Sequence, residues 1–115
     1  MLYRIAEPDD WEQAQKTGFF ASPDLAAEGF IHCSEPHQVL ETAQLYYAGR
    51  SGLQLLELDE EALATAGVRV KREWVERRQQ HFAHVLGAVP LAAVRRVWAF
   101  GTKAVDGKFS LPDGL

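Results

Sequence analysis

The chain has 115 residues, of which 47% are apolar and 24% charged, and its net charge is −4 at pH 7. This length and composition suit one folded domain with a buried core and exclude a disordered chain. The acidic balance argues against general affinity for nucleic acid, and a single cysteine excludes both an internal disulfide and a multi-cysteine zinc site.

We expect neither a secretory signal nor a membrane span in this sequence. Met1 to Arg4 lead directly into a charged segment, which is unlike a secretory signal. No apolar run approaches the roughly 18 residues that a membrane span requires. We therefore expect a cytoplasmic protein without a membrane partner, forming a single domain over residues 1–115 with a loose tail over 105–115.

The first third of the sequence predicts two strands and one helix. Leu2 to Ile5 alternates and is read as a strand. A helix is expected from Pro8, which suits a first turn, to a stop at Gly18. The segment from Phe19 to Glu28 is expected to be a loop, with Ser22-Pro23-Asp24 as a turn. Phe30 to Cys33 then forms the second strand.

The middle of the chain predicts two helices around one strand. The first helix runs from about Pro36 to Ala48, and Ser34 is well placed as its N-cap. Leu53 to Leu58 alternates and is largely apolar, which predicts a buried strand. Asp59 to Glu61 then begin a short helix that ends at Gly67.

The last third predicts mainly strands. Its expected elements are a strand over Val68–Arg72, a polar loop over Glu76–Gln80, an extended segment over Phe82–Leu86, a helical turn over Pro90–Ala93, a strand over Val94–Phe100 and a turn at Asp106-Gly107. Together the elements predict an α+β domain with a small mixed or antiparallel split sheet and about three short helices.

His32 is the first candidate for a functional residue. On a strand its side chain shares a face with Ser34, whereas Cys33 points toward the core. A histidine beside an open helix N-terminus has a suitable environment for an anion. The alternatives are a buried structural histidine and a serine that only caps the helix. Cys33 is not expected to be a nucleophile, because a thiol buried in an apolar run is inert.

A second histidine segment follows about fifty residues later. His81 and His84 face opposite sides of an extended segment, so at most one joins a pocket with His32, and His84 is the better candidate because apolar residues flank it. His32, His37 and His84 are also conceivable zinc ligands, although no His-x-x-x-His pair or acidic cluster accompanies them.

Charged residues near the expected strand over Val68–Arg72 have two interpretations. Glu73, beside Trp74, would bind a ribose hydroxyl or orient a sugar ring, or else would pair at the surface with Arg72 or Lys71. The basic residues of this region form either a solvated edge or a contact for phosphate: Arg69, Lys71, Arg72, Arg77 and Arg78.

These motifs in this order resemble the bacterial domain-of-unknown-function family 952. The resemblance rests on Tyr3-Arg4-Ile5, Trp11, Gly29 to Ser34, Gln38, Thr42-Ala43 and Phe82 to Gly87, and it extends to about Phe100. It implies a fold similar to that of ADP-ribosyltransferases, in which NAD or a related nucleotide lies in a cleft between two small sheets. It brings no established reaction with it.

The resemblance also implies roles for individual residues. His32, His84 and Glu73 would be catalytic, with Glu73 as the acid that contacts the ribose. The residues that would bind the ligand are Tyr3, Arg4, Ser34 and Gln38. The chain departs from the family pattern in one segment, where Ala83 replaces a proline and Val85-Leu86 precedes Gly87 without the usual tyrosine.

The sequence thus leads to one main expectation and two alternatives. We expect a pocket for a nucleotide or NAD-related ligand and, as the implied reaction, transfer on ADP-ribose or phosphorylated ribose. NAD would then be a substrate, and no cofactor is called for. The alternatives are a non-catalytic small-molecule binding or interaction module, which the missing tyrosine favours, and a zinc-dependent hydrolase.

Overall fold

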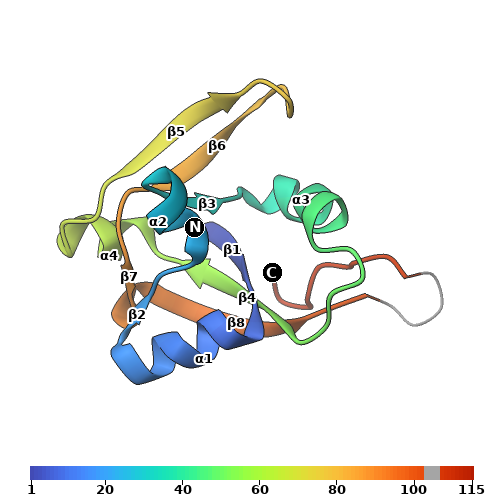
Figure 1. The fold of residues 1–115 in the computed structure, drawn as a ribbon, viewed down its shortest axis with the longest axis horizontal. Helices are drawn as coiled ribbons and strands as arrows, with labels where there is room; N and C mark the ends of the chain where they lie inside the picture. Colours follow the sequence, from blue (N-terminus) through green and yellow to red (C-terminus); the bar gives the residue numbers. More distant parts are fainter. Residues whose placement is uncertain (103–106) are drawn as a thin grey trace.

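Two three-stranded sheets form most of the fold in the computed structural model, which describes residues 1–102 and 107–115 (Figure 1). The first sheet has the order β1 (Leu2–Ala6), β4 (Leu53–Leu58), β8 (Val94–Phe100). The second has the order β3 (Ile31–Cys33), β6 (Gln80–Val85), β5 (Val70–Val75). A short ladder joins β2 (Phe19–Phe20) to β7 (Val89–Pro90), and every strand pair is antiparallel. The predicted α+β class with small antiparallel sheets is confirmed.

The two larger sheets meet at one isolated bridge. The Tyr3 amide donates to the Ser34 carbonyl at 2.9 Å, and the Ser34 amide donates to the Tyr3 carbonyl at 2.8 Å. Because β1 is otherwise the edge of its sheet on this side, the residues that follow Tyr3 are not covered by a neighbouring strand. This opening is where the candidate site lies.

Four α-helices and two 3-10 turns surround the sheets. They are α1 (Pro8–Thr17), α2 (Pro23–Glu28), α3 (Val39–Tyr46), α4 (Glu60–Thr65), η1 (Pro36–Gln38) and η2 (Leu91–Ala93). Helix α1 begins at Pro8 and ends before Gly18, whose φ of 87° is the left-handed conformation that glycine adopts readily. Among the described residues, none of the helices is both long enough and apolar enough to span a membrane.

The predicted loop from Phe19 to Glu28 is wrong, because it contains β2 and α2. Ser22 and Pro23 do change the direction of the chain, but they do so at the start of a helix. Ser22 has the extended backbone of an N-cap and Pro23 occupies the first turn. Ser22, Pro23 and Asp24 therefore satisfy the rules for a turn as well as those for the start of a helix.

The predicted cap at Ser34 is also wrong. The backbone amide and carbonyl of Ser34 are hydrogen-bonded to Tyr3 in the bridge, and the residue that caps η1 is Glu35. Glu35 and Gln38 form a reciprocal capping box, in which the Glu35 amide donates to Gln38 Oε1 at 3.0 Å. The single helix expected over Pro36–Ala48 is divided into η1 and α3 and ends at Tyr46.

In the last third, β5 starts two residues later than predicted and forms a hairpin with β6. The turn between them ends at Gln79, whose φ of 55° is left-handed. The strand Val94–Phe100 is confirmed with the same bounds. In the tail, Phe109 is buried against Phe100, with the ring centres 5.2 Å apart. The turn predicted at Asp106-Gly107 includes Asp106, which lies outside the described residues.

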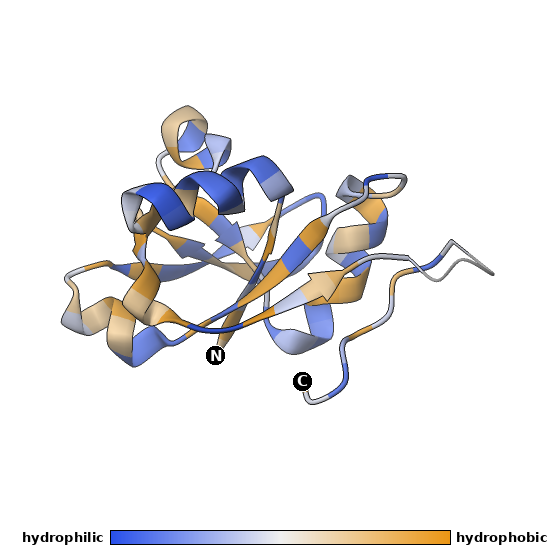
Figure 2. Ribbon diagram, turned by 90° about the horizontal axis from the view of Figure 1, so that it is seen from below, coloured by the Kyte–Doolittle hydropathy of each residue, from blue (hydrophilic) through white to orange (hydrophobic). Residues whose placement is uncertain are grey.

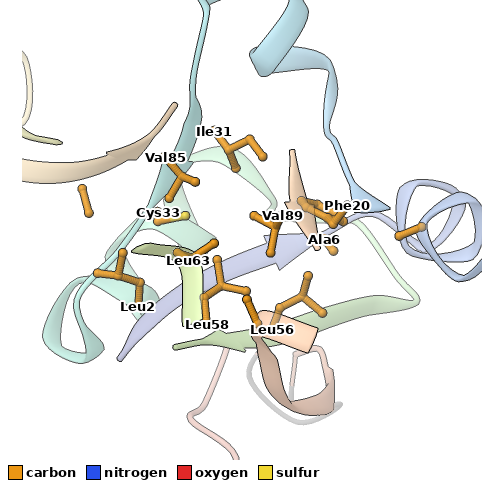
Figure 3. Packing of buried hydrophobic residues seen from close by; sticks show 13 residues of the cluster. Leu2, Ala6, Phe20, Ile31, Cys33, Leu56, Leu58, Leu63, Val85 and Val89 are labelled. Carbon is orange, nitrogen blue, oxygen red and sulfur yellow. The ribbon is translucent and has the colours of Figure 1, made fainter. Parts of the chain in front are cut away.

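The core consists of two apolar clusters on the two faces of the first sheet. One cluster fills the space between the sheets, where Leu56 and Leu58 face Ile31, Cys33 and Val85 (Figure 3). The other cluster lies beneath α3 and is formed by Tyr3, Ile5, Val39, Ala43, Leu53, Leu55, Phe100 and Phe109. Hydropathy accordingly alternates along several strands (Figure 2).

Candidate functional site

A cavity of about 490 Å³ lies beside the bridge that joins the two sheets. Its wall is contributed by β1, α1, α2, β3, α3 and the β5–β6 hairpin. The volume falls within the range of pockets that hold small organic ligands. The ribbon shows α2 and α3 on the two sides of β3, with the hairpin extending above them (Figure 1).

Arg4 and Asp24 form a nearly buried ion pair in this wall. Arg4 Nη1 lies 2.7 Å from Asp24 Oδ2 and 3.0 Å from the His32 carbonyl oxygen. The two side chains are only 11% and 13% exposed. Arg4 Nε is buried and has no hydrogen-bond partner among the described residues.

Asp24 is held in its ionised form. Burial raises the pKa of this carboxyl. The charge of Arg4 and the hydrogen bonds from the His32 amide and the Ser22 hydroxyl lower the pKa by more than burial raises it, so the pKa of Asp24 lies below its usual value. A fixed carboxylate in turn fixes the guanidinium of Arg4. The pair is therefore a preorganised polar element of the cavity.

Two more acids line the same side of the cavity. Glu7 pairs with Arg50, whose Nη1 is 3.1 Å from Glu7 Oε1. Asp10, in the first turn of α1, has a raised pKa because of burial, which the positive charge of Arg4 opposes and the negative charges of Asp24 and Asp9 reinforce. A carboxyl with a raised pKa in a cavity is a reasonable candidate for proton exchange or for a hydrogen bond to a ligand.

Two arginines from the β5–β6 turn form the opposite wall. Arg78 Nη2 lies 3.0 Å from both Glu41 Oε1 and Thr42 Oγ1 on α3. Its guanidinium also lies 4.5 Å from the centre of the Phe82 ring. The guanidinium of Arg77 is 5.8 Å from the centre of the Tyr46 ring. These contacts hold the hairpin turn against α3.

Four of the residues expected to form the site line this cavity: Tyr3, Arg4, His32 and Ser34. His32 is 40% exposed, and its Nε2 lies 2.8 Å from Glu28 Oε2. Ser34 Oγ is buried and 3.4 Å from Thr42 Oγ1. The Tyr3 hydroxyl instead donates to Glu57 at 2.8 Å, and burial together with this hydrogen bond raises the pKa of Tyr3 to about 12.

His84 lies next to His32, and Glu73 contacts His84, but neither His84 nor Glu73 is part of the cavity wall. His32 and His84 are cross-strand neighbours of β3 and β6, and their ring centres are 5.2 Å apart. His84 Nδ1 is 2.9 Å from Glu73 Oε1, which lowers the pKa of Glu73. Phe30 stacks on His84 with 4.0 Å between ring centres, and His84 Nε2 is buried with no partner among the described residues. Glu73 thus pairs with His84, whereas Arg72 pairs with Glu35 and Glu60.

Gln38 and Cys33 have structural surroundings. Gln38 does not line the cavity. Its Nε2 donates to the Gln80 side chain at 3.1 Å and to the His81 carbonyl at 2.8 Å, which ties η1 to β6. Cys33 is 2% exposed, and burial raises the pKa of its thiol to about 12, so its predicted place in the core is confirmed.

Several cavity residues were not singled out from the sequence as members of a site. They are Asp10, Asp24 and Arg50. Arg77 and Arg78, which also line the cavity, were considered from the sequence only within the larger group of basic residues that form a solvated edge or a phosphate contact. Asp10 and Asp24 are each an acid in the first turn of a helix. This position is explained by helix stabilisation alone, so it does not distinguish a residue of the site from a residue that only favours the helix. Within residues 1–102 and 107–115, no group of three or more His, Cys, Asp or Glu side chains is placed to hold a metal ion.

The fold and the cavity define a small α+β protein with an arginine-lined pocket beside the junction of two antiparallel sheets. The chain belongs to the family described as "Protein of unknown function (DUF952)", whose model matches residues 5–97.

Solved structures of one relative show the same fold. The crystal structure of protein CC0527 from Caulobacter crescentus has 30% sequence identity and a TM-score of 0.82, covering 95% of this chain and 92% of that one. The solution NMR structure of the same protein gives a TM-score of 0.76, with 93% and 89% covered. Comparison with curated proteins gives no match.

Proposed function

We propose that the cavity binds a nucleotide or another phosphorylated ribose compound, with NAD and ADP-ribose among its candidate ligands. The observation that carries this proposal is the convergence of Arg4, Arg50, Arg77 and Arg78 on one cavity of ligand size, from three separate parts of the chain. Arginine is well suited to phosphate because its planar guanidinium donates several hydrogen bonds at once.

The remaining wall suits the rest of such a ligand. Tyr46 and Tyr47 offer aromatic surface, and the carboxyl groups of Glu7 and Asp10 can accept hydrogen bonds from sugar hydroxyls. His32 would bind a ribose or phosphate oxygen, and Ser34 would contribute its hydroxyl. The capping box at Glu35 and Gln38 already uses donors at the start of η1, so we assign the anion to the arginines instead.

A transfer reaction at the anomeric carbon is the catalytic form of this proposal. Bond breaking there develops positive charge on the sugar, which a nearby carboxylate stabilises. His32 would contact the ligand, His84 would support His32 through their ring contact, and Glu73 would orient His84. The acid nearest the ligand would then be Asp10 or Asp24 rather than Glu73.

The second candidate function is a binding module without catalysis. It is favoured by the position of Glu73, whose carboxylate is occupied by His84 outside the cavity wall. The two forms differ in one measurement. Incubation with NAD releases nicotinamide if transfer or hydrolysis occurs, whereas the binding module leaves NAD intact. No cluster of metal ligands among the described residues supports the zinc-dependent hydrolase, and elemental analysis of the purified protein tests it directly.

Calorimetric titration with NAD, ADP-ribose, a nucleoside monophosphate and ribose 5-phosphate tests the proposal. We expect saturable binding of at least one of them, weakened by His32→Ala. His37→Ala is the matched control, because His37 is an exposed histidine that does not line the cavity. Absence of heat with all four ligands, or equal binding by the two variants, would contradict the proposal.

A further inference from the structure

The cavity arginines differ in whether a carboxylate already balances their charge. Arg4 pairs with Asp24 at 2.7 Å, Arg50 with Glu7 at 3.1 Å and Arg78 with Glu41 at 3.0 Å. A ligand phosphate at any of these three would compete with the carboxylate already in place. These arginines mainly offer hydrogen bonds, and little net positive charge.

Arg77 is different, because it makes no ion pair with any residue in the part of the chain that the structure describes. It is exposed and lines the cavity, which places it at the mouth. Its guanidinium lies near the Tyr46 ring, at 5.8 Å from the centre, and the neighbouring Arg78 anchors the turn to Glu41 and Thr42. An anionic group at the mouth therefore meets an unbalanced positive charge on an anchored turn.

The inner part of the cavity has the opposite character. Asp10 and Asp24 both line it, and they flank Arg4, whose side chain is only 11% exposed. A second phosphate placed there would be repelled by carboxylates and would lose its hydration. Hydroxyl groups fit better, because they can donate to the carboxyl oxygens of Asp10 and Asp24.

We propose that the ligand is a phosphate monoester of a sugar or nucleoside, with its single phosphate against Arg77 at the mouth and its hydroxyl groups inside, against Arg4 and Asp10. This inference rests on the function proposed above and narrows it to compounds with one terminal phosphate group. Because the phosphate binds at the mouth and the hydroxyl groups bind inside, the uncharged end of the ligand enters the cavity first.

The test is a titration of the full chain with ribose 5-phosphate, ribose, inorganic phosphate, AMP and ADP at fixed ionic strength, with Arg77→Ala and Arg69→Ala as a matched pair. Arg69 is also exposed and basic, but it does not line this cavity. We expect Arg77→Ala to weaken ribose 5-phosphate binding by about tenfold or more, the usual effect of losing one charge-assisted contact. Ribose binding should be equal in both variants, and Arg69→Ala should bind ribose 5-phosphate within about twofold of the parent.

Asp10→Asn tests the inner end in the same way. This substitution should weaken the binding of ribose 5-phosphate and leave the binding of inorganic phosphate unchanged. Circular dichroism of each variant verifies that it is folded. Equal binding of ribose 5-phosphate by Arg77→Ala and Arg69→Ala would overturn this inference and leave the proposed function standing. Tighter binding of ADP than of AMP, or of inorganic phosphate than of ribose 5-phosphate, would overturn it as well. Absence of binding by every phosphorylated ligand, NAD and ADP-ribose included, would contradict the proposed function itself.

Discussion

Asp24 is the residue that organises the inner end of the cavity. Its carboxylate receives Arg4, the His32 amide and the Ser22 hydroxyl, and it therefore joins α2 to β1 and β3. Removing one member of a nearly buried ion pair leaves the other charge without a partner, which costs more than the pair itself contributes. The carboxylate is thus important for folding as well as for the shape of the cavity.

We predict that Asp24→Asn lowers the free energy of unfolding by about 3 kcal/mol at pH 7, because the buried guanidinium of Arg4 loses its counter-charge. Urea unfolding measures this difference. Asp9→Asn is the control, since Asp9 is exposed and makes no side-chain hydrogen bond or ion pair with the described residues. Equal stability of the two variants would contradict the prediction.

The same variant should reveal a dependence on pH. The pKa of Asp24 is lowered in the folded protein, so its contribution is complete above the unfolded value of about 4 and is lost as the pH falls through the folded pKa. We expect the stability difference between the parent and Asp24→Asn to narrow between about pH 4 and pH 2. A difference that stays constant over this interval, measured by urea unfolding, would show that the carboxylate charge is not the cause.

Cys33 should be unreactive in the folded protein. With the pKa near 12, the thiolate fraction at pH 8 is about a thousandfold below that of a free cysteine, and burial further blocks access. We expect a thiol reagent to modify Cys33 at pH 8 only after denaturant is added. Stoichiometric modification within minutes in buffer would place the thiol at the surface.

At the level of elements, local patterns predicted most strands and the helices with clear ends. Alternation predicted the strands β1 and β4, and α1 is bounded by Pro8 and Gly18. Helix α2 was missed because Ser22, Pro23 and Asp24 satisfy the rules for a turn as well as those for a helix start. The cap at Ser34 was misplaced because the bridge to Tyr3, 31 residues away in sequence, claims its backbone.

Gln38 links two elements, and its removal should loosen both. We predict that Gln38→Ala lowers the free energy of unfolding by about 2 kcal/mol, because hydrogen bonds to the Glu35 amide, Gln80 and the His81 carbonyl are lost in a buried site. Amide hydrogen exchange should accelerate at the start of α3. Gln44→Ala, at an exposed position of the same helix, should change neither measurement; a similar loss in both variants would refute the role of Gln38.

At the level of the whole molecule, the cavity follows from tertiary contacts that sequence patterns do not encode. Arg78 contacts Glu41 and Thr42 only because the β5–β6 hairpin extends over α3. Alternation places a side chain on a face of a strand, but it does not say which distant helix that face will meet. The closeness of His32 and His84 was considered from the sequence as a possibility, and the pairing of β3 with β6 provides it.

The C-terminal segment contributes to the second apolar cluster. We predict that Phe109→Ala lowers the free energy of unfolding by about 3 kcal/mol, because Phe109 is 7% exposed and stacks on Phe100. Leu111→Ala is the control, since Leu111 is 39% exposed. Urea unfolding that leaves Phe109→Ala as stable as Leu111→Ala would mean that the segment adds nothing to the core.

The position of β5 has a consequence for the behaviour of many molecules together. This strand is outermost in its sheet, so one of its edges carries backbone groups with which a strand of another chain can pair. Lys71, Arg72 and Glu73 are exposed along it. An incoming strand would have to strip water from these charges, and repulsion between like residues would oppose growth of a continuous intermolecular sheet. The charged residues of β5 therefore oppose edge-to-edge pairing of this strand with another chain.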